Sequence, residues 1–152
     1  MSTSRGRPPI RLLLDTNIVV SGLLWNGPPR RLLDLVTSTN AVMFYTSAAL
    51  IEELRRTLAY RKFDKRLSAA GMTVDTLASH YRSLTRVVQP VEARGFVPDD
   101  PDDDIVVATA IAAHANLIVS GDDDLLRLEE IANIAVVTAV DALNVVGMWA
   151  NG

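Results

Sequence analysis

The 152-residue sequence contains no cysteine, which excludes disulfide bonds, thiolate metal sites and cysteine nucleophiles. Its two histidines, His80 and His114, have no candidate catalytic partner near them in the sequence. Long hydrophobic runs are also absent. The longest, Ile105–Ala113, is interrupted by Thr109 and falls well short of the roughly 18 residues that a membrane helix needs. The basic start of the chain precedes no long apolar segment, so no signal peptide is expected. We therefore expect a cytoplasmic protein without membrane contact.

The composition is that of an ordinary globular domain. Hydrophobic residues make up 49% and charged residues 22% of the chain, close to the average for folded proteins. Since domains usually span about 100–200 residues, we expect a single domain over residues 11–150. A flexible tail over residues 1–10 is expected to precede it.

Charges are segregated along the chain despite a net charge of only −3. This balance argues against a protein that coats nucleic acid non-specifically, for which a basic domain is expected. Eight aspartates and no lysine or arginine lie between Asp99 and Asp124. A basic cluster comprises Arg55, Arg56, Arg61, Lys62, Lys65 and Arg66. Carboxylates that converge in a fold repel one another and need a cation or protons to coexist. The pattern is compatible with an acidic site beside a basic rim, or with charges that cover solvated faces.

Short apolar segments alternate with helical ones. The expected strands are 11–14, 42–45, 117–120 and 135–138. The expected helices cover residues 17–25, 30–37, 63–88 with a break near Gly71, and 141–149. Two more are expected: one that Ser47 caps and that runs to about Tyr60, and one that begins at residues 102–104. A loop is expected over residues 89–101. Such alternation predicts an α/β fold, with a central, mostly parallel sheet covered by helices on both faces. Leu23, Leu24 and Trp25 are interpreted as core rather than as an interface, because apolar residues at helical spacing are usually buried.

Two strands are each followed by an aspartate. Asp15 comes directly after the first strand, and the Ser120-Gly121-Asp122 sequence closes the third. Ligands of parallel sheets bind beyond the carboxyl ends of the strands. We therefore expect Asp15 and Asp122 to lie together at the edge where function is usually found.

Two further acidic spots are candidates for the same site. On a helical wheel, Glu53 lies near the edge of an apolar stripe and can face a cleft, whereas Glu52 points further round to water. The acids Asp102, Asp103 and Asp104 open an apolar helix. Several carboxylates without histidine or cysteine suit hard divalent cations such as Mg²⁺ or Mn²⁺. Each acid also has a structural interpretation as a turn, a helix cap or a solvated surface residue.

Four segments in this order resemble the PIN-domain family. They are LLLDTNIVVSGLL, ALIEELRRTL, DPDDDIVVATAIAAHANLIVSGDDDLL and the final VVTAVDAL. The similarity extends from about Leu12 to Trp149 and is strongest to the toxin components of type II toxin–antitoxin systems, the VapC-type toxins. The resemblance implies a three-layer α/β/α sandwich and ribonuclease activity that depends on Mg²⁺ or Mn²⁺, with one or two ions bound.

The resemblance also assigns site residues by position. The catalytic, metal-binding acids fall on Asp15, Glu53, Asp104 and Asp122. Supporting positions fall on Asn17, Ser120 and Asp124, with Asp103 added because the three adjacent acids at 102–104 leave the ligand open by one residue. Ser120 is often threonine in the family. The family further suggests a homodimer and a small antitoxin partner.

These assignments predict metal-assisted hydrolysis of an RNA phosphodiester, and the resemblance to the family implies a 5′-phosphate and a 3′-hydroxyl as the products. Four cations are candidates for steering the RNA backbone through long-range attraction: Arg55, Arg56, Arg61 and Lys62. The sequence leaves open the RNA target, and whether the protein is a toxin or an RNA-processing enzyme.

Three other functions fit parts of the same pattern. A haloacid-dehalogenase-type phosphatase requires acids where this chain has Asn17 and Leu126. A phospho-receiver domain requires a lysine after a late strand, but the only lysines are Lys62 and Lys65. A PIN-like module that binds RNA or protein without cutting remains an alternative, although acids stand at every matched position.

Overall fold

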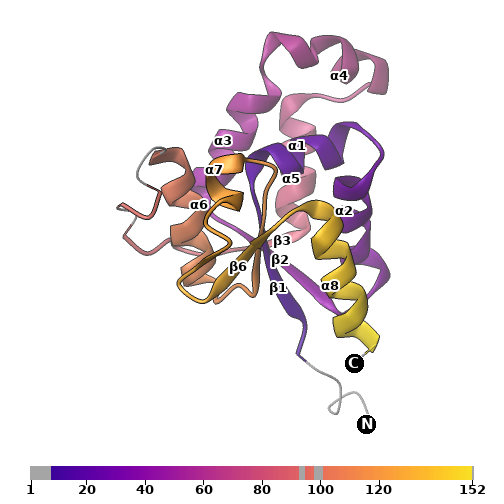
Figure 1. Cartoon of the computed structure of the whole chain (residues 1–152). Helices are drawn as coiled ribbons and strands as arrows, with labels where there is room; N and C mark the ends of the chain where they lie inside the picture. Colours follow the sequence, from indigo (N-terminus) through magenta and orange to yellow (C-terminus); the bar gives the residue numbers. More distant parts are fainter. Residues whose placement is uncertain (1–7, 93–94, 98–100, 152) are drawn as a thin grey trace.

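The computed structural model describes residues 8–92, 95–97 and 101–151. Within these residues a six-stranded sheet runs in the order β3-β2-β1-β4-β6-β5 (Figure 1). The strands are β1 Ile10–Leu14, β2 Val42–Thr46, β3 Thr85–Val87, β4 Leu117–Val119, β5 Glu130–Ile131 and β6 Ile134–Val137. All neighbouring pairs are parallel except β5 and β6, which are antiparallel. The predicted α/β/α sandwich with a mostly parallel sheet is confirmed.

Helices cover both faces of the sheet. They are α1 Thr16–Leu24, α2 Pro28–Ser38, α3 Ala48–Leu58, α4 Asp64–Ala70, α5 Val74–Ser83, α6 Pro101–Ala112, α7 Asp123–Leu126 and α8 Ala139–Asn151, with a 3₁₀ turn η2 at Arg61–Phe63. The predicted loop over 89–101 includes residues 93–94 and 98–100, and the predicted tail includes residues 1–7; these segments lie outside the described residues.

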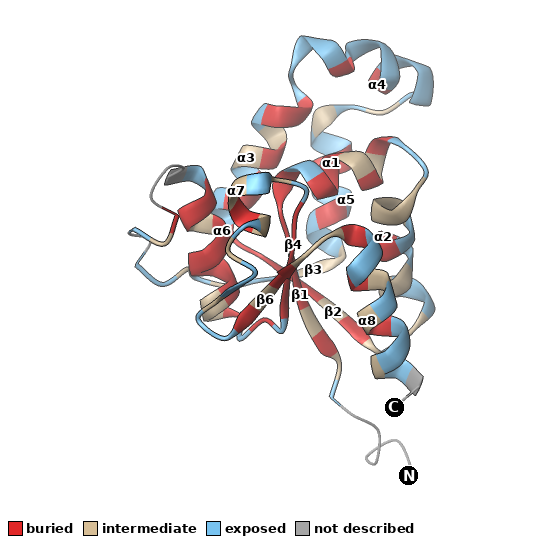
Figure 2. Cartoon of the chain, viewed as in Figure 1, coloured by how far each residue is buried: buried red, intermediate tan, exposed pale blue. Residues whose placement is uncertain are grey.

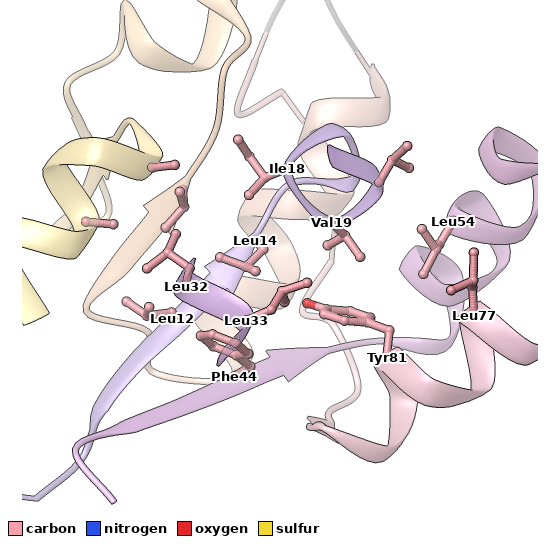
Figure 3. Packing of buried hydrophobic residues seen from close by; sticks show 14 of the residues in the cluster. Leu12, Leu14, Ile18, Val19, Leu32, Leu33, Phe44, Leu54, Leu77 and Tyr81 are labelled. Carbon is pink, nitrogen blue, oxygen red and sulfur yellow. The ribbon is translucent and has the colours of Figure 1, made fainter. Parts of the chain in front are cut away.

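The central strands are apolar because both of their faces are buried. Leu12 and Leu14 of β1 point into a cluster that contains residues of α1, α2, α3, α5 and α8, part of which is drawn in Figure 3. Leu13, between them, points into a second cluster, which contains residues of α6. Side chains of successive strand residues alternate between faces, so one run of leucines contributes to two cores. Figure 2 shows the resulting band of buried residues through the sheet.

Local signals fix several helix ends. Ser47 caps α3, since its hydroxyl accepts a hydrogen bond from the Leu50 N–H at 3.3 Å, as the sequence predicts. Gly71 ends α4 in the left-handed region, with φ of 66°, a conformation that glycine adopts without strain. Gly22 lets α1 and α2 approach closely, because an added Cβ would lie 2.7 Å from Leu33 Cδ1 and 3.0 Å from the Pro29 carbonyl oxygen.

The helix expected over 63–88 is wrong beyond Ser83. There the chain enters β3, which pairs with β2 as an edge strand. Two short elements, α7 and β5, were not predicted at all.

The interpretation of this segment as core is confirmed for Leu24, which is 4% exposed, and wrong for Trp25, which is 42% exposed. The Trp25 ring packs edge-on against Phe63, with 5.8 Å between the centroids.

The two ends of the described chain meet at the amino end of β1. The Trp149 indole in α8 donates a hydrogen bond to the Pro8 carbonyl at 2.9 Å. Figure 1 shows both ends at the bottom of the view, away from the carboxyl ends of the parallel strands. No helix among the described residues is both long and apolar enough to cross a membrane.

Candidate functional site

Asp15 is fixed at the point where β1 becomes α1. Its backbone N–H donates to the Val119 carbonyl at 2.9 Å, which continues the pairing of β1 with β4. The side chain caps α1: Oδ1 accepts from the Thr16 N–H at 2.7 Å. The second oxygen, Oδ2, accepts from the Ser120 hydroxyl at 2.9 Å. The side chain therefore caps a helix and also belongs to an acidic cleft, so the structural and functional interpretations of Asp15 coexist.

Ser120 connects Asp15 to Asp122. Its fully buried Oγ donates to Asp15 and accepts from the Asp122 N–H at 2.9 Å. Asp122 in turn caps α7, where its Oδ1 accepts from the Asp124 N–H at 2.8 Å. One hydroxyl thus positions two acids that follow different strands.

The third acid of the cluster comes from the first turn of α6. Asp103 is 5% exposed. One carboxylate oxygen each of Asp15, Asp103 and Asp122 lies within 4.8 Å of the others. The helices α1, α6 and α7 meet around this point, at the carboxyl ends of the strands (Figure 1).

Asp104, the acid expected in this place, is directed elsewhere. Its Oδ1 accepts from the Val97 N–H at 2.6 Å, and its Oδ2 accepts from the Gly95 N–H at 3.1 Å. Both of its carboxylate oxygens are thus bonded to the segment that precedes α6. Successive helical residues point about 100° apart, so adjacent acids face different surroundings, and Asp103 is the one of the three that belongs to the cluster. The assignment of Asp104 as a ligand stays a prediction, and this geometry favours Asp103.

Glu53 lines the same cleft but is not a member of the three-acid cluster. Its Oε1 accepts from the Thr16 hydroxyl at 2.8 Å. Its neighbour Glu52 is exposed, as the helical wheel predicts. The cleft has a volume of about 320 Å³ and is lined by Asp15, Thr16, Asn17, Glu53, Thr57, Tyr60, Lys62, Asp102, Asp103 and Asp122.

The remaining predicted residues differ in their relation to the cleft. Asn17 lines it, whereas Asp124 does not and forms an ion pair with Arg127 at 3.5 Å. Of the four predicted RNA-contacting cations, only Lys62 lines the cleft. Arg55 forms an ion pair with Asp75 of α5. Arg56 and Arg61 are exposed and do not line it.

Three cleft residues were missed by the sequence interpretation. Thr16 binds two acids, through its N–H to Asp15 and through its hydroxyl to Glu53. Thr57 and Tyr60 also line the cleft. The sequence does indicate the position of Thr57 and Tyr60, because residues four and seven positions after Glu53 lie on the same face of a helix as Glu53. The position of Thr16 is indicated by its place directly after Asp15.

Burial and the neighbouring acids perturb Asp15. The pKa of its carboxyl is raised from 3.8 to about 6, chiefly by burial and to a smaller extent by the negative charges of Glu53 and Asp122. The hydrogen bonds from Ser120 and Thr16 act in the opposite direction. Burial disfavours a charged carboxylate, and like charges add to that effect. A bound cation would reverse the balance and favour the ionised form.

The donor set fits a hard divalent cation. Only oxygen ligands are present in the cluster of three acids, and Mg²⁺ and Mn²⁺ prefer carboxylate and water oxygens. Oxygens on opposite sides of a Mg²⁺ ion lie about 4.2 Å apart. Oxygens within 4.8 Å of one another can therefore share one ion after small side-chain rotations.

Comparisons with known proteins point to one fold. A family model described as PIN domain matches residues 11–124. The crystal structure of VapBC2 from Rickettsia felis bound to a DNA fragment from their promoter is similar at 16% identity, with a TM-score of 0.57, over 84% of this chain and 97% of that one. PAE2754 from Pyrobaculum aerophilum is similar at 12% identity, with a TM-score of 0.57, over 94% and 92%. No curated protein matches this chain.

Proposed function

Because this chain belongs to the PIN-domain family, we propose that it is a metal-dependent endoribonuclease that hydrolyses RNA phosphodiester bonds. PIN domains are generally nucleases. The observation that supports this proposal most directly is the convergence of Asp15, Asp103 and Asp122 within 4.8 Å. A buried cluster of carboxylates without a cation is electrostatically unfavourable, and a site that binds Mg²⁺ or Mn²⁺ accounts for it.

Each residue of the site has a role in this proposal. Asp15, Asp103 and Asp122 would bind the cation, which when bound polarises the phosphodiester and acidifies water. Ser120 and Thr16 orient the two oxygens of Asp15 through the hydrogen bonds described above.

Glu53 has a different role from the three acids of the cluster. It lies beside them with one oxygen bonded to the Thr16 hydroxyl. This placement suits an acceptor for the proton that the attacking water loses, and Asn17 offers a neutral donor and acceptor at the mouth of the cleft.

The biological role that we propose is that of a toxin paired with a small antitoxin protein. The fold shared with VapBC2 and the resemblance of the four sequence segments support this role. The same interpretation extends to a homodimer and to a cytoplasmic location. A PIN-like module that binds RNA without cutting is the alternative.

The test is cleavage of end-labelled RNA by the purified protein with Mg²⁺, Mn²⁺ or EDTA. We expect cleavage with either metal and none with EDTA. The variants Asp122→Asn and Asp123→Asn form a matched pair: both remove one negative charge, and Asp123 is exposed and outside the cleft. We expect Asp122→Asn to lose cleavage and Asp123→Asn to keep it. Equal cleavage by both variants would exclude this site, and a folded protein that never cleaves would favour the binding module.

A further inference from the structure

The strand β3 forms one edge of the sheet, and no strand lies on its outer side among the described residues. The Val88 N–H donates to the Thr46 carbonyl of β2 at 2.8 Å. Because the backbone groups of successive strand residues point to opposite sides, the N–H and the carbonyl of Val87 point away from β2. Val87 is also 46% exposed. An edge with unpaired backbone groups and an exposed apolar side chain is a template for another extended segment.

A hollow lies at each end of β3. The first has a volume of about 220 Å³ and is lined by residues of α2, β2 and β3, among them Phe44 and Thr85. The second has a volume of about 480 Å³ and is lined by Ala48, Ala49 and residues 87–90. Neither hollow shares a lining residue with the acidic cleft. A segment that lay along β3 would therefore pass between two hollows that can take its side chains, away from the proposed catalytic site.

This edge of the sheet is basic, although the chain as a whole has a net charge of −3. Residues 76–91 contain two arginines, Arg82 and Arg86, and no aspartate or glutamate. Both arginines are exposed, and neither forms an ion pair with a described residue. In the second hollow, Ala48 and Ala49 are the first two residues of α3, and the free N–H groups of a helix's first turn attract carboxylates. Both features favour an acidic occupant.

A second copy of the chain fits this edge less well. A two-fold pairing of β3 with β3 would bring Arg86 of one copy close to Arg86 of the other. Like charges that face each other across two strands are unfavourable. The unpaired charge of Arg86 therefore argues for a different chain with acidic side chains.

We infer that the outer side of β3 is a docking site for an acidic, extended segment of another protein, which adds a strand to the sheet. Recognition by strand addition combines main-chain hydrogen bonds with pockets for alternate side chains. Arg86 and Val87 are neighbours in β3 and point to opposite faces of the sheet. The segment should therefore place an acid beside Arg86 and apolar residues on either side of that acid. This inference does not rest on the proposed function, because neither Arg86 nor Val87 lines the acidic cleft.

A designed peptide tests the charge and the pattern. The probe is an eight-residue peptide of alternating valine and glutamate with an N-terminal fluorescein, and its anisotropy is followed with the full chain at low salt. We expect Arg86→Glu to weaken binding about 5- to 30-fold, because one attraction is lost and one repulsion is gained. The matched control is Arg31→Glu, which reverses the charge of an exposed residue of α2 that lines neither hollow. It should stay within about twofold of the wild type.

Two further changes test the backbone pairing. Val87→Pro removes the N–H that points to the outer side of β3, a position where an edge strand tolerates proline. It should weaken binding at least about tenfold, whereas Val87→Ile keeps the N–H and should stay within about twofold. The same peptide methylated at every backbone nitrogen keeps its charge but cannot donate hydrogen bonds, and it should not bind. Urea unfolding checks each variant, and the methylated peptide tests the pairing even if Val87→Pro does not fold.

Four results would overturn the inference. The first is a wild-type protein that does not bind the peptide, and the second is equal binding by Arg86→Glu or of the methylated peptide. The third is a wild-type dimer that Arg86→Glu dissociates, which would make a second copy the occupant. The fourth is displacement of the peptide by a 12-nucleotide oligouridine, which would assign the edge to nucleic acid. Metal-dependent RNA cleavage should be the same in Arg86→Glu and the wild type, so failure of the nuclease proposal and failure of this one are separate results.

Discussion

Replacement of Asp15 by asparagine should stabilise the fold in the absence of metal. Burial and the nearby acids raise the pKa of Asp15 from 3.8 to about 6, so the folded state binds this proton more tightly than the unfolded state. The stabilisation from the protonated carboxyl is complete below pH 3.8 and is lost as the pH rises through about 6. At pH 8 the wild-type protein therefore contains an ionised, buried carboxylate that weakens it.

The size of the effect follows from the shift in pKa. One pKa unit corresponds to about 1.4 kcal/mol. For a shift from 3.8 to about 6, the lost stabilisation is about 1.5 kcal/mol at pH 5 and about 3 kcal/mol at pH 8. Asparagine has no charge, and its oxygen can still accept from the Thr16 N–H. Its amide group can donate to the Ser120 oxygen, which also accepts from the Asp122 N–H. The contact with Ser120 is then kept with its direction reversed, the Ser120 hydroxyl proton gives up the acceptor that Asp15 provides, and the variant loses the penalty of the buried charge.

The assay is urea unfolding of the wild type and Asp15→Asn in EDTA at pH 5 and pH 8. We expect the variant to be more stable at both values, with an advantage that is about 1–2 kcal/mol larger at pH 8. Excess Mg²⁺ at pH 8 should then stabilise the wild type more than the variant, because binding to the folded state adds to stability. Because the variant and the wild type share their other titrating groups, the contributions of those groups to the free energy of unfolding cancel when the two proteins are compared at each pH.

An advantage of Asp15→Asn that does not change between pH 5 and pH 8 would refute the argument from a buried, ionising carboxylate. The exposed variant Asp123→Asn serves as the control. It removes the same formal charge from an exposed position outside the cleft.

Four other substitutions test further features of the site and the core. Asp103→Asn should weaken Mg²⁺ binding in calorimetry with little change in the urea midpoint. Asp104→Asn should do the opposite and lower the free energy of unfolding by about 1–3 kcal/mol, because an amide NH₂ cannot accept from a backbone N–H; equal Mg²⁺ affinities in the two variants would contradict the geometry. Gly22→Ala should destabilise the protein by about 1–3 kcal/mol through overpacking against Leu33, measured by urea unfolding. Tyr81→Phe should be neutral or stabilising by up to about 2 kcal/mol in the same assay, because the buried Tyr81 hydroxyl has no hydrogen-bond partner among the described residues and an unsatisfied buried group is unfavourable; a clear loss of stability would show that the hydroxyl is bonded.

The parts of the fold that the sequence predicted are those with strong local signals. β1 is a run of leucines that ends at an acid, and α3 begins at a serine cap. β3 was missed because its three residues are partly or fully exposed and follow a helix, so no apolar alternation marks them. Their pairing with β2 is a contact across about 40 positions in the sequence, which no local pattern encodes.

The candidate site likewise has one part that the sequence predicts and one part that it does not. The placement of Asp15 and Asp122 after strands follows from topology and could be predicted. The choice of Asp103 over Asp104 depends on the rotation of α6 about its axis, which is set when Val106, Val107 and Ala110 pack into the second core. The sequence shows three adjacent acids, and tertiary packing decides that Asp103 reaches the three-acid cluster while Asp104 bonds to the segment before α6.

The hydrogen bond between Trp149 and Pro8 has a practical consequence for handling the protein. Both ends of the described chain lie at the amino end of β1, and the acidic cleft lies at the opposite end of the sheet (Figure 1). An affinity tag, a fluorophore or a surface tether attached at either end would therefore leave the cleft open to a long ligand. Because the ends are neighbours, a circularly permuted chain with a short linker between them should also retain the arrangement of the sheet.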